Sequence, residues 1–129
     1  MLAVDTNIIV RYLTRDDPEQ SARARQLVDD AEILVSSTVF LETEWVLRSG
    51  YGFSSAQIAE RLRAFAGLPQ VTVEAPAAMA MALDWMIAGM DFADALHLAG
   101  AEHCEAFVTF DRHLANAARR SAGTEVRVL

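Results

Sequence analysis

Four acidic residues stand where predicted helices and strands begin or end. Asp5 and Asp111 each follow a short apolar run, while Glu42 and Asp94 lie in the first turns of predicted helices. Carboxylates that converge repel one another unless a hard cation shares them. The pattern therefore predicts a divalent-metal site, with phosphodiester chemistry as its leading use.

Short apolar strands that alternate with helices must position these acids. This alternation predicts an α/β fold with a mostly parallel sheet of about five strands, covered on both faces by helices, in a single domain over residues 1–129. Ligands bind at the carboxyl ends of the strands in such sheets, where all four acids are expected to meet. Strands are expected at residues 2–4, 33–36, 71–73, 106–109 and 125–129. Helices are expected at residues 7–13, 18–30 with Asp17 as N-cap, 38–48 with Thr38 as N-cap, from Ser54 or Ser55 to Gly67, 76–89, 91–103 and from Asp111 onward.

Each acid also has a structural explanation. Asp5 and Asp111 could be only N-caps of the helices that follow them. Asp91 and Asp94 have the spacing of a capping box, so Asp91 could be an outer metal ligand or only a cap. Four independent caps need not converge, whereas four acids at one sheet edge would, and this favours a shared site.

Glu42 is the most informative of the four acids. Its helical neighbours include Trp45 and Val46, so we expect Glu42 to face inward on an apolar stripe with no local partner. Glu44 faces elsewhere and can pair with Arg48 four residues on, so we expect it to be ordinary surface.

Composition bounds the class of protein. Hydrophobic residues make up 53% of 129 residues and mean hydropathy is +0.18, which indicates a globular domain. No apolar run approaches the roughly 18 residues that span a membrane, and we expect no signal peptide at the start. Cys104 is the only cysteine, so an internal disulfide and a cysteine-rich zinc site are excluded, and a cytoplasmic location is expected.

The charge balance argues against broad nucleic-acid binding through a basic surface. The net charge is −7, and all eleven basic residues are arginine. A nuclease whose bound cations neutralise its site is still compatible with this charge.

Four segments, in this order, resemble PIN-domain ribonucleases and, among them, the VapC toxins of type II toxin–antitoxin pairs. They are Val-Asp-Thr-Asn-Ile at residues 4–8, the Glu42 helix, Asp-Phe-Ala-Asp-Ala-Leu at 91–96 and Thr-Phe-Asp-Arg-His at 109–113. The resemblance implies a PIN-like three-layer α/β/α domain. It also implies Mg²⁺ or Mn²⁺ as cofactor, an RNA substrate, a homodimer and an antitoxin that blocks the site. The implied catalytic residues are Asp5, Glu42, Asp94 and Asp111.

Within this quartet we expect Asp5 and Asp94 to be the principal metal ligands. Glu42 and Asp111 would hold a second ion or order its waters. The polar residues Thr6, Asn7 and Thr109 are expected to orient the carboxylates by hydrogen bonds. His97 could contact the site, but a structural role is favoured for it.

Two other functions stay open. A metal-dependent phosphohydrolase acting on small phosphoesters also needs clustered aspartates, but the haloacid-dehalogenase type requires an aspartate where this chain has Asn7. A noncatalytic interaction module that kept the fold would be favoured by an incomplete quartet, and here the quartet is complete.

Overall fold

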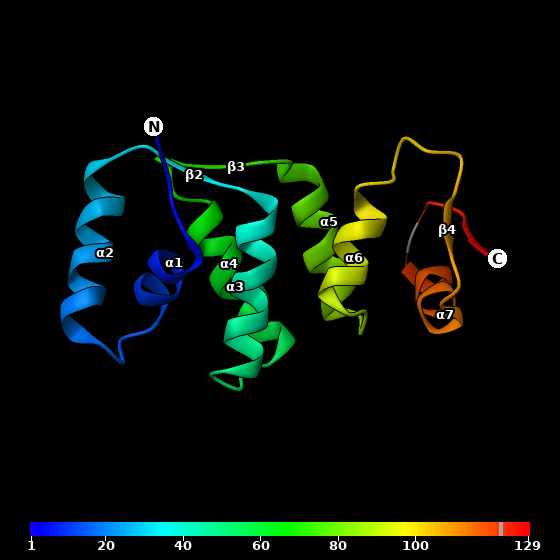
Figure 1. Cartoon of the computed structure of the whole chain (residues 1–129), viewed down its shortest axis with the longest axis horizontal. Helices are drawn as coiled ribbons and strands as arrows, with labels where there is room; N and C mark the ends of the chain where they lie inside the picture. Colours follow the sequence, from blue (N-terminus) through cyan, green and yellow to red (C-terminus); the bar gives the residue numbers. More distant parts are fainter. Residues whose placement is uncertain (122) are drawn as a thin grey trace. The chain divides into compact units, whose positions relative to one another are not determined.

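The computed structural model describes residues 1–121 and 123–129, which form two compact units, Met1–Ala75 and Pro76–Leu129. Within these residues it shows seven helices and five strands (Figure 1). All strand pairs are parallel, which confirms the predicted α/β class. The five strands form a three-stranded sheet in the first unit and a two-stranded sheet in the second.

The first unit contains the three-stranded sheet, in the order β1-β2-β3. Parallel neighbours require a crossover, and α1 and α2 connect β1 to β2 while α3 and α4 connect β2 to β3. The strands are β1 (Leu2–Ala3), β2 (Ile33–Val35) and β3 (Val71–Val73). The helices are α1 (Thr6–Leu13), α2 (Pro18–Asp30), α3 (Ser37–Ser49) and α4 (Ser55–Ala66).

The core of the first unit consists of apolar side chains from both helices and strands. Helix α1 packs on α2 and α3, and α4 packs on β3. The largest fully buried side chains are Ile9, Val28, Ile33, Val35, Phe40, Leu47, Ile58, Leu62 and Phe65.

The second unit pairs two helices, then adds a strand–helix–strand segment. Helices α5 (Pro76–Ile87) and α6 (Phe92–Ala99) pack against one another. Strands β4 (Phe107–Thr109) and β5 (Val126–Val128) are joined by α7 (Arg112–Ser121), which packs on β5. Buried apolar residues here include Met79, Leu83, Met86, Phe92, Leu98 and Leu114.

Local capping chemistry fixes where most helices start. Asp17 caps α2 with Pro18 at its first position, as predicted, and Ser54 and Gln57 form a capping box at α4. The predicted cap of α3 was wrong, because Ser36 rather than Thr38 accepts the hydrogen bond from the Val39 amide. No helix in the described part of the chain is long and apolar enough to cross a membrane.

Candidate functional site

The first unit brings two of the predicted acids together through one threonine. Asp5 is the N-cap of α1, and its Oδ1 accepts a hydrogen bond from the Thr6 amide at 2.7 Å. The Thr6 hydroxyl donates to Oε1 of Glu42 on α3. Thr6 is buried, whereas Asp5 and Glu42 are both exposed. A buried hydroxyl therefore orients one acid, and the backbone of the same residue orients the other.

The direction in which Glu42 points corrects the sequence-based expectation. The buried face of α3 carries Phe40, Thr43, Glu44 and Leu47, so Glu42 lies on the solvent side. Trp45, which was taken as part of an apolar stripe, is 57% exposed. The partner of Glu42 comes from another helix, because the Thr6 hydroxyl of α1 donates to it, in keeping with the expectation that Thr6 orients the carboxylates.

Glu44 is the buried acid of this helix. It is only 2% exposed, and Nε of Arg48 donates to its Oε2 at 2.9 Å. The predicted pairing with Arg48 is confirmed, while the predicted surface position is wrong. The residues at i, i+3, i+4 and i+7 from Phe40 to Leu47 form this face, but only Phe40 and Leu47 are apolar, so the sequence pattern did not mark it as the buried one.

In the second unit, two acids lie at the N-terminal end of helix α6. Asp91 is the N-cap of α6, and its Oδ2 accepts a hydrogen bond from the Asp94 amide at 3.2 Å. Asp94 lies in the first turn and is half-buried. Helix α6 ends at Ala99, four residues before the predicted end, because Gly100 caps it and donates to Leu96 and Leu98 carbonyls.

Asp94 carries the clearest electrostatic signal among the predicted site residues. Burial raises the pKa of its carboxyl above the ordinary value, and the neighbouring charges of Asp91 and Asp111 raise it further. His97 and His113 oppose these effects. The negative charge of Asp111 is therefore close enough to raise the pKa of Asp94, which indicates that these two acids of the second unit lie near one another.

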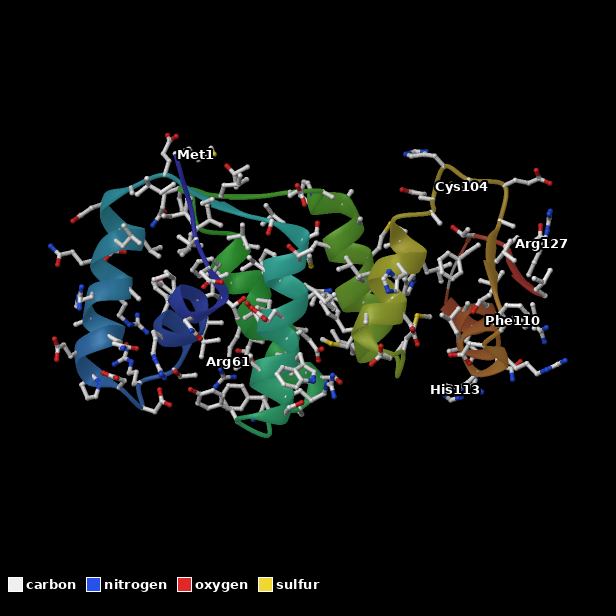
Figure 2. The ribbon with its side chains drawn as sticks, in the orientation of Figure 1. Met1, Arg61, Cys104, Phe110, His113 and Arg127 are labelled. Atoms are coloured by element: carbon white, nitrogen blue, oxygen red, sulfur yellow. The ribbon has the colours of Figure 1, made fainter. Side chains whose placement is uncertain are left out.

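Asp111 follows β4 and is held by its own backbone surroundings. Its Oδ1 accepts hydrogen bonds from the amides of His113 at 2.9 Å and Leu114 at 3.1 Å. The Thr109 hydroxyl accepts from the Asp111 amide at 3.0 Å, so this threonine orients the acid through its backbone. Figure 2 shows Phe110, which precedes Asp111 after β4, and His113 in the first turn of α7.

One carboxylate oxygen of each capping aspartate is left over after these bonds. Within residues 1–121 and 123–129, Oδ2 of Asp5 and Oδ2 of Asp111 accept no hydrogen bond from the protein. Both side chains are exposed at these positions. Each aspartate can therefore cap its helix through Oδ1 and bind a metal ion through Oδ2.

The oxygen atoms of these carboxylates and hydroxyls are of the chemical type that binds a hard divalent cation. Carboxylate oxygens with hydroxyl and water neighbours are the ligands that Mg²⁺ prefers. Within the described residues, no group of three or more histidine, cysteine, aspartate or glutamate side chains is arranged to hold a metal. Asp5 and Glu42 belong to the first unit, and Asp94 and Asp111 to the second.

A groove beside the Asp5 end of α1 was not found from the sequence. It has a volume of about 520 Å³ and lies along α1 and α2, which pack side by side (Figure 1). We call it the α1–α2 groove. The spacing of Gln20, Arg23 and Leu27 on one helix face was the available signal. Its lining includes Asn7, Ile8, Arg11, Gln20, Arg23 and Leu27.

Comparison with protein families gives one match over almost the whole chain. A family model described as the PIN domain matches residues 2–120, and the chain belongs to this family. No curated protein matches the chain. PIN domains are generally nucleases that act on RNA and typically use divalent metals, which supports the predicted class of activity.

Proposed function

We propose that this PIN-domain protein is a Mg²⁺- or Mn²⁺-dependent endoribonuclease that acts as the toxin of a toxin–antitoxin pair. The observation that carries the proposal is the state of the capping aspartates. Asp5 and Asp111 are exposed residues that each cap a helix with Oδ1, and within the described part of the chain Oδ2 of neither accepts a hydrogen bond. The positive end of each helix also favours negative charge there.

In this proposal Asp5 and Asp94 are the principal metal ligands, and Glu42 and Asp111 complete the catalytic set. A bound divalent ion supplies a water of lowered pKa and stabilises charge on the scissile phosphate. Asp94 suits a ligand role because burial and the charges of Asp91 and Asp111 disfavour its ionised form in the protein alone. A nearby cation would reverse that preference.

The remaining residues orient these carboxylates. Thr6 holds Glu42 by its hydroxyl and Asp5 by its amide, and Thr109 holds the backbone of Asp111. Orienting bonds of this kind typically change metal affinity or activity by about 10–100-fold when removed. Asp91 caps α6 and contributes charge to Asp94.

The toxin role and the homodimer rest on the resemblance of the sequence to VapC toxins, and the cytoplasmic location rests on the single cysteine. An antitoxin would place a basic side chain, in our proposal an arginine, against the acids, in place of the metal's charge. We propose that the turn after α3, which carries Tyr51 and Phe53, is the edge of the surface that binds the antitoxin. The ring centroids of Tyr51 and Phe53 are 5.9 Å apart, and Cζ of Arg61 lies 4.4 Å from the centroid of the Phe53 ring.

The discriminating experiment compares two substrates. The purified chain is incubated in Mn²⁺ with a labelled RNA and, separately, with a generic phosphate monoester. Cleavage of the RNA alone, with 5′-phosphate and 3′-hydroxyl ends by mass spectrometry, supports the proposal. Release of phosphate from the ester alone supports the phosphohydrolase, and no turnover of either supports a noncatalytic module.

The partner part of the proposal has its own test. Light scattering of the purified chain is expected to give a dimer, and the product of the adjacent gene is expected to co-purify with it. A monomer at micromolar concentration that has no co-purifying partner and does not restrain growth would contradict the toxin role. RNA cleavage by such a monomer would still support the nuclease.

A further inference from the structure

The α1–α2 groove differs in charge from the chain as a whole. The chain has a net charge of −7, yet the residues that line the groove include two arginines and no acid. Arg11 is paired with Asp16 outside the lining, so Arg23 supplies the uncompensated positive charge among the residues that the structure describes. A local positive charge raises the concentration of anions nearby, even on a protein of negative net charge. The groove is therefore a place where a polyanion can contact this acidic protein.

Arg11 is held in place within the groove. Its Nε donates to Oε1 of Gln20 at 2.8 Å, and its Nη1 donates to Oδ1 of Asp16 at 3.0 Å and to the Tyr51 hydroxyl at 3.3 Å. These bonds come from α2, the α1–α2 loop and the turn after α3. They fix the guanidinium before any ligand binds, which lowers the entropy cost of binding.

Arg23 is the uncommitted cation of the groove. Within residues 1–121 and 123–129 it makes no hydrogen bond or ion pair, and its side chain is exposed. The planar guanidinium has a fork of donors that matches phosphate oxygens. Arg23 can thus contact an anion without first breaking an internal bond.

The apolar part of the lining suits the rest of a nucleotide. Ile8 and Leu27 line the groove beside these cations, and both are half-buried. Sugars and base faces pack on such side chains, while the charged contacts are made to the phosphates. A lining that is both cationic and apolar fits a single RNA strand better than a free phosphate.

One end of the groove is lined by the first turn of α1, which Asp5 caps. Asn7 lines it and follows Asp5 and Thr6 in the first turn of α1. Arg11 lies four residues farther along, which is about 6 Å along the helix axis. Successive phosphates of an extended strand are spaced closely enough to reach from one to the other.

We propose that the α1–α2 groove binds the sugar-phosphate backbone of single-stranded RNA next to the cleaved bond, with Arg23 and Arg11 contacting its phosphates. The proposal rests on the nuclease function above, and it assigns a substrate-binding role to residues outside the acidic quartet.

The test measures RNA binding in EDTA, so that binding is read without metal-dependent cleavage. Fluorescence anisotropy of a short labelled single-stranded RNA is recorded for the wild type, Arg23→Ala, Arg23→Glu and Arg63→Glu. Arg63 is an exposed arginine of α4 outside the groove lining, so Arg63→Glu makes the same charge change elsewhere on the first unit. Circular dichroism of each variant checks that it is folded.

The expected result is a groove-specific loss of binding. Arg23→Ala should raise the Kd about threefold and reduce the slope of log K against log salt by about 0.7, as expected for one lost phosphate contact on a single strand. Arg23→Glu should raise the Kd about tenfold, whereas Arg63→Glu should change it less than about twofold. Equal effects of Arg23→Glu and Arg63→Glu would overturn the groove proposal.

Cleavage assays separate this proposal from the nuclease itself. For a cleaving wild type, Arg23→Ala should raise KM for RNA and leave kcat nearly unchanged. Cleavage with a KM that does not depend on Arg23 contradicts the groove and leaves the nuclease supported. A wild type that binds RNA through Arg23 but cleaves nothing contradicts the nuclease and supports the groove.

Discussion

At the scale of single residues, the ionised carboxylate of Asp94 destabilises the folded protein when no cation is bound near it. Burial, then the charges of Asp91 and Asp111, raise the pKa of its carboxyl. Folding therefore favours the protonated acid. The stability that the neutral acid contributes is present below the ordinary aspartate pKa and is lost as the pH rises through the raised one.

We predict that Asp94→Asn raises the melting temperature of the metal-free protein at neutral pH. The amide has no charge to desolvate or to repel Asp91 and Asp111. The gain should shrink as the pH falls below the ordinary aspartate pKa, where the wild-type acid is also neutral. Thermal unfolding in EDTA measures it, with Asp29→Asn on an exposed part of α2 as the matched control. A gain that is the same at both pH values would contradict the charge explanation.

Glu42 and Glu44 offer a second residue-scale contrast. We predict that Glu42→Gln lowers RNA cleavage with little effect on stability, because its side chain is exposed and bonds only to the Thr6 hydroxyl within the described residues. Glu44→Gln should do the opposite and lower the free energy of unfolding by about 1–3 kcal/mol, because Glu44 is buried against Arg48.

Both variants are measured by urea unfolding and by initial cleavage rates. Equal losses of activity in the two variants would remove the reason to assign Glu42 to the site. A large loss of stability in Glu42→Gln would indicate a structural role for it instead.

At the scale of elements, a small polar network fixes the α1–α2 hairpin. The Tyr51 hydroxyl donates to Oδ2 of Asp16 at 2.7 Å and accepts from Arg11. The bond from Tyr51 is the leading cause that lowers the pKa of Asp16, followed by bonds from Thr14 and Arg11, with burial acting against them. A lowered pKa contributes stability above the ordinary aspartate value, and that stability is lost as the pH falls through the lowered one.

We predict that Tyr51→Phe lowers the melting temperature by a few degrees at neutral pH and by less in acid, where Asp16 is protonated in both proteins. Differential scanning calorimetry at the two pH values measures the difference. Tyr12→Phe removes a hydroxyl that makes no hydrogen bond within residues 1–121 and 123–129, and it should have a much smaller effect. Equal effects of the two substitutions would show that the network does not stabilise the hairpin.

The elements themselves were largely predictable because their signals are local. A few adjacent residues predicted the Asp17-Pro18 start of α2, the start of α4 at Ser54 or Ser55 and the β-branched strand Val71–Val73. The inward face of α3 was predicted wrongly, since Trp45 was assumed to be buried and is exposed. The sequence gives which residues share a helix face, but packing against other elements decides which face is covered.

The sequence predicts which residue types form the candidate site, but it predicts fewer of the contacts that these residues make. Asp5, Asp91 and Asp111 cap helices as the simplest explanation had it, and Thr6 orients Glu42 as expected. The α1–α2 groove depends on how two helices pack, so neither its volume nor its lining could be predicted from spacing alone.

At the scale of the whole molecule, an acidic chain must act on an acidic polymer. With eleven arginines, no lysine and a net charge of −7, long-range attraction to RNA is unfavourable. In our proposal binding therefore depends on local features, namely the groove arginines and a cation held by the carboxylates.

The most direct measurement of the central claim is RNA cleavage as a function of Mn²⁺ concentration for the wild type, Asp5→Asn, Asp94→Asn and the Asp29→Asn control. We predict that the wild type and the control cleave only with added metal and lose activity in EDTA. Asp5→Asn and Asp94→Asn should fold normally and lose at least about a hundredfold in rate. Cleavage by either variant at the wild-type rate, or wild-type cleavage that persists in EDTA, would contradict the carboxylate-held metal.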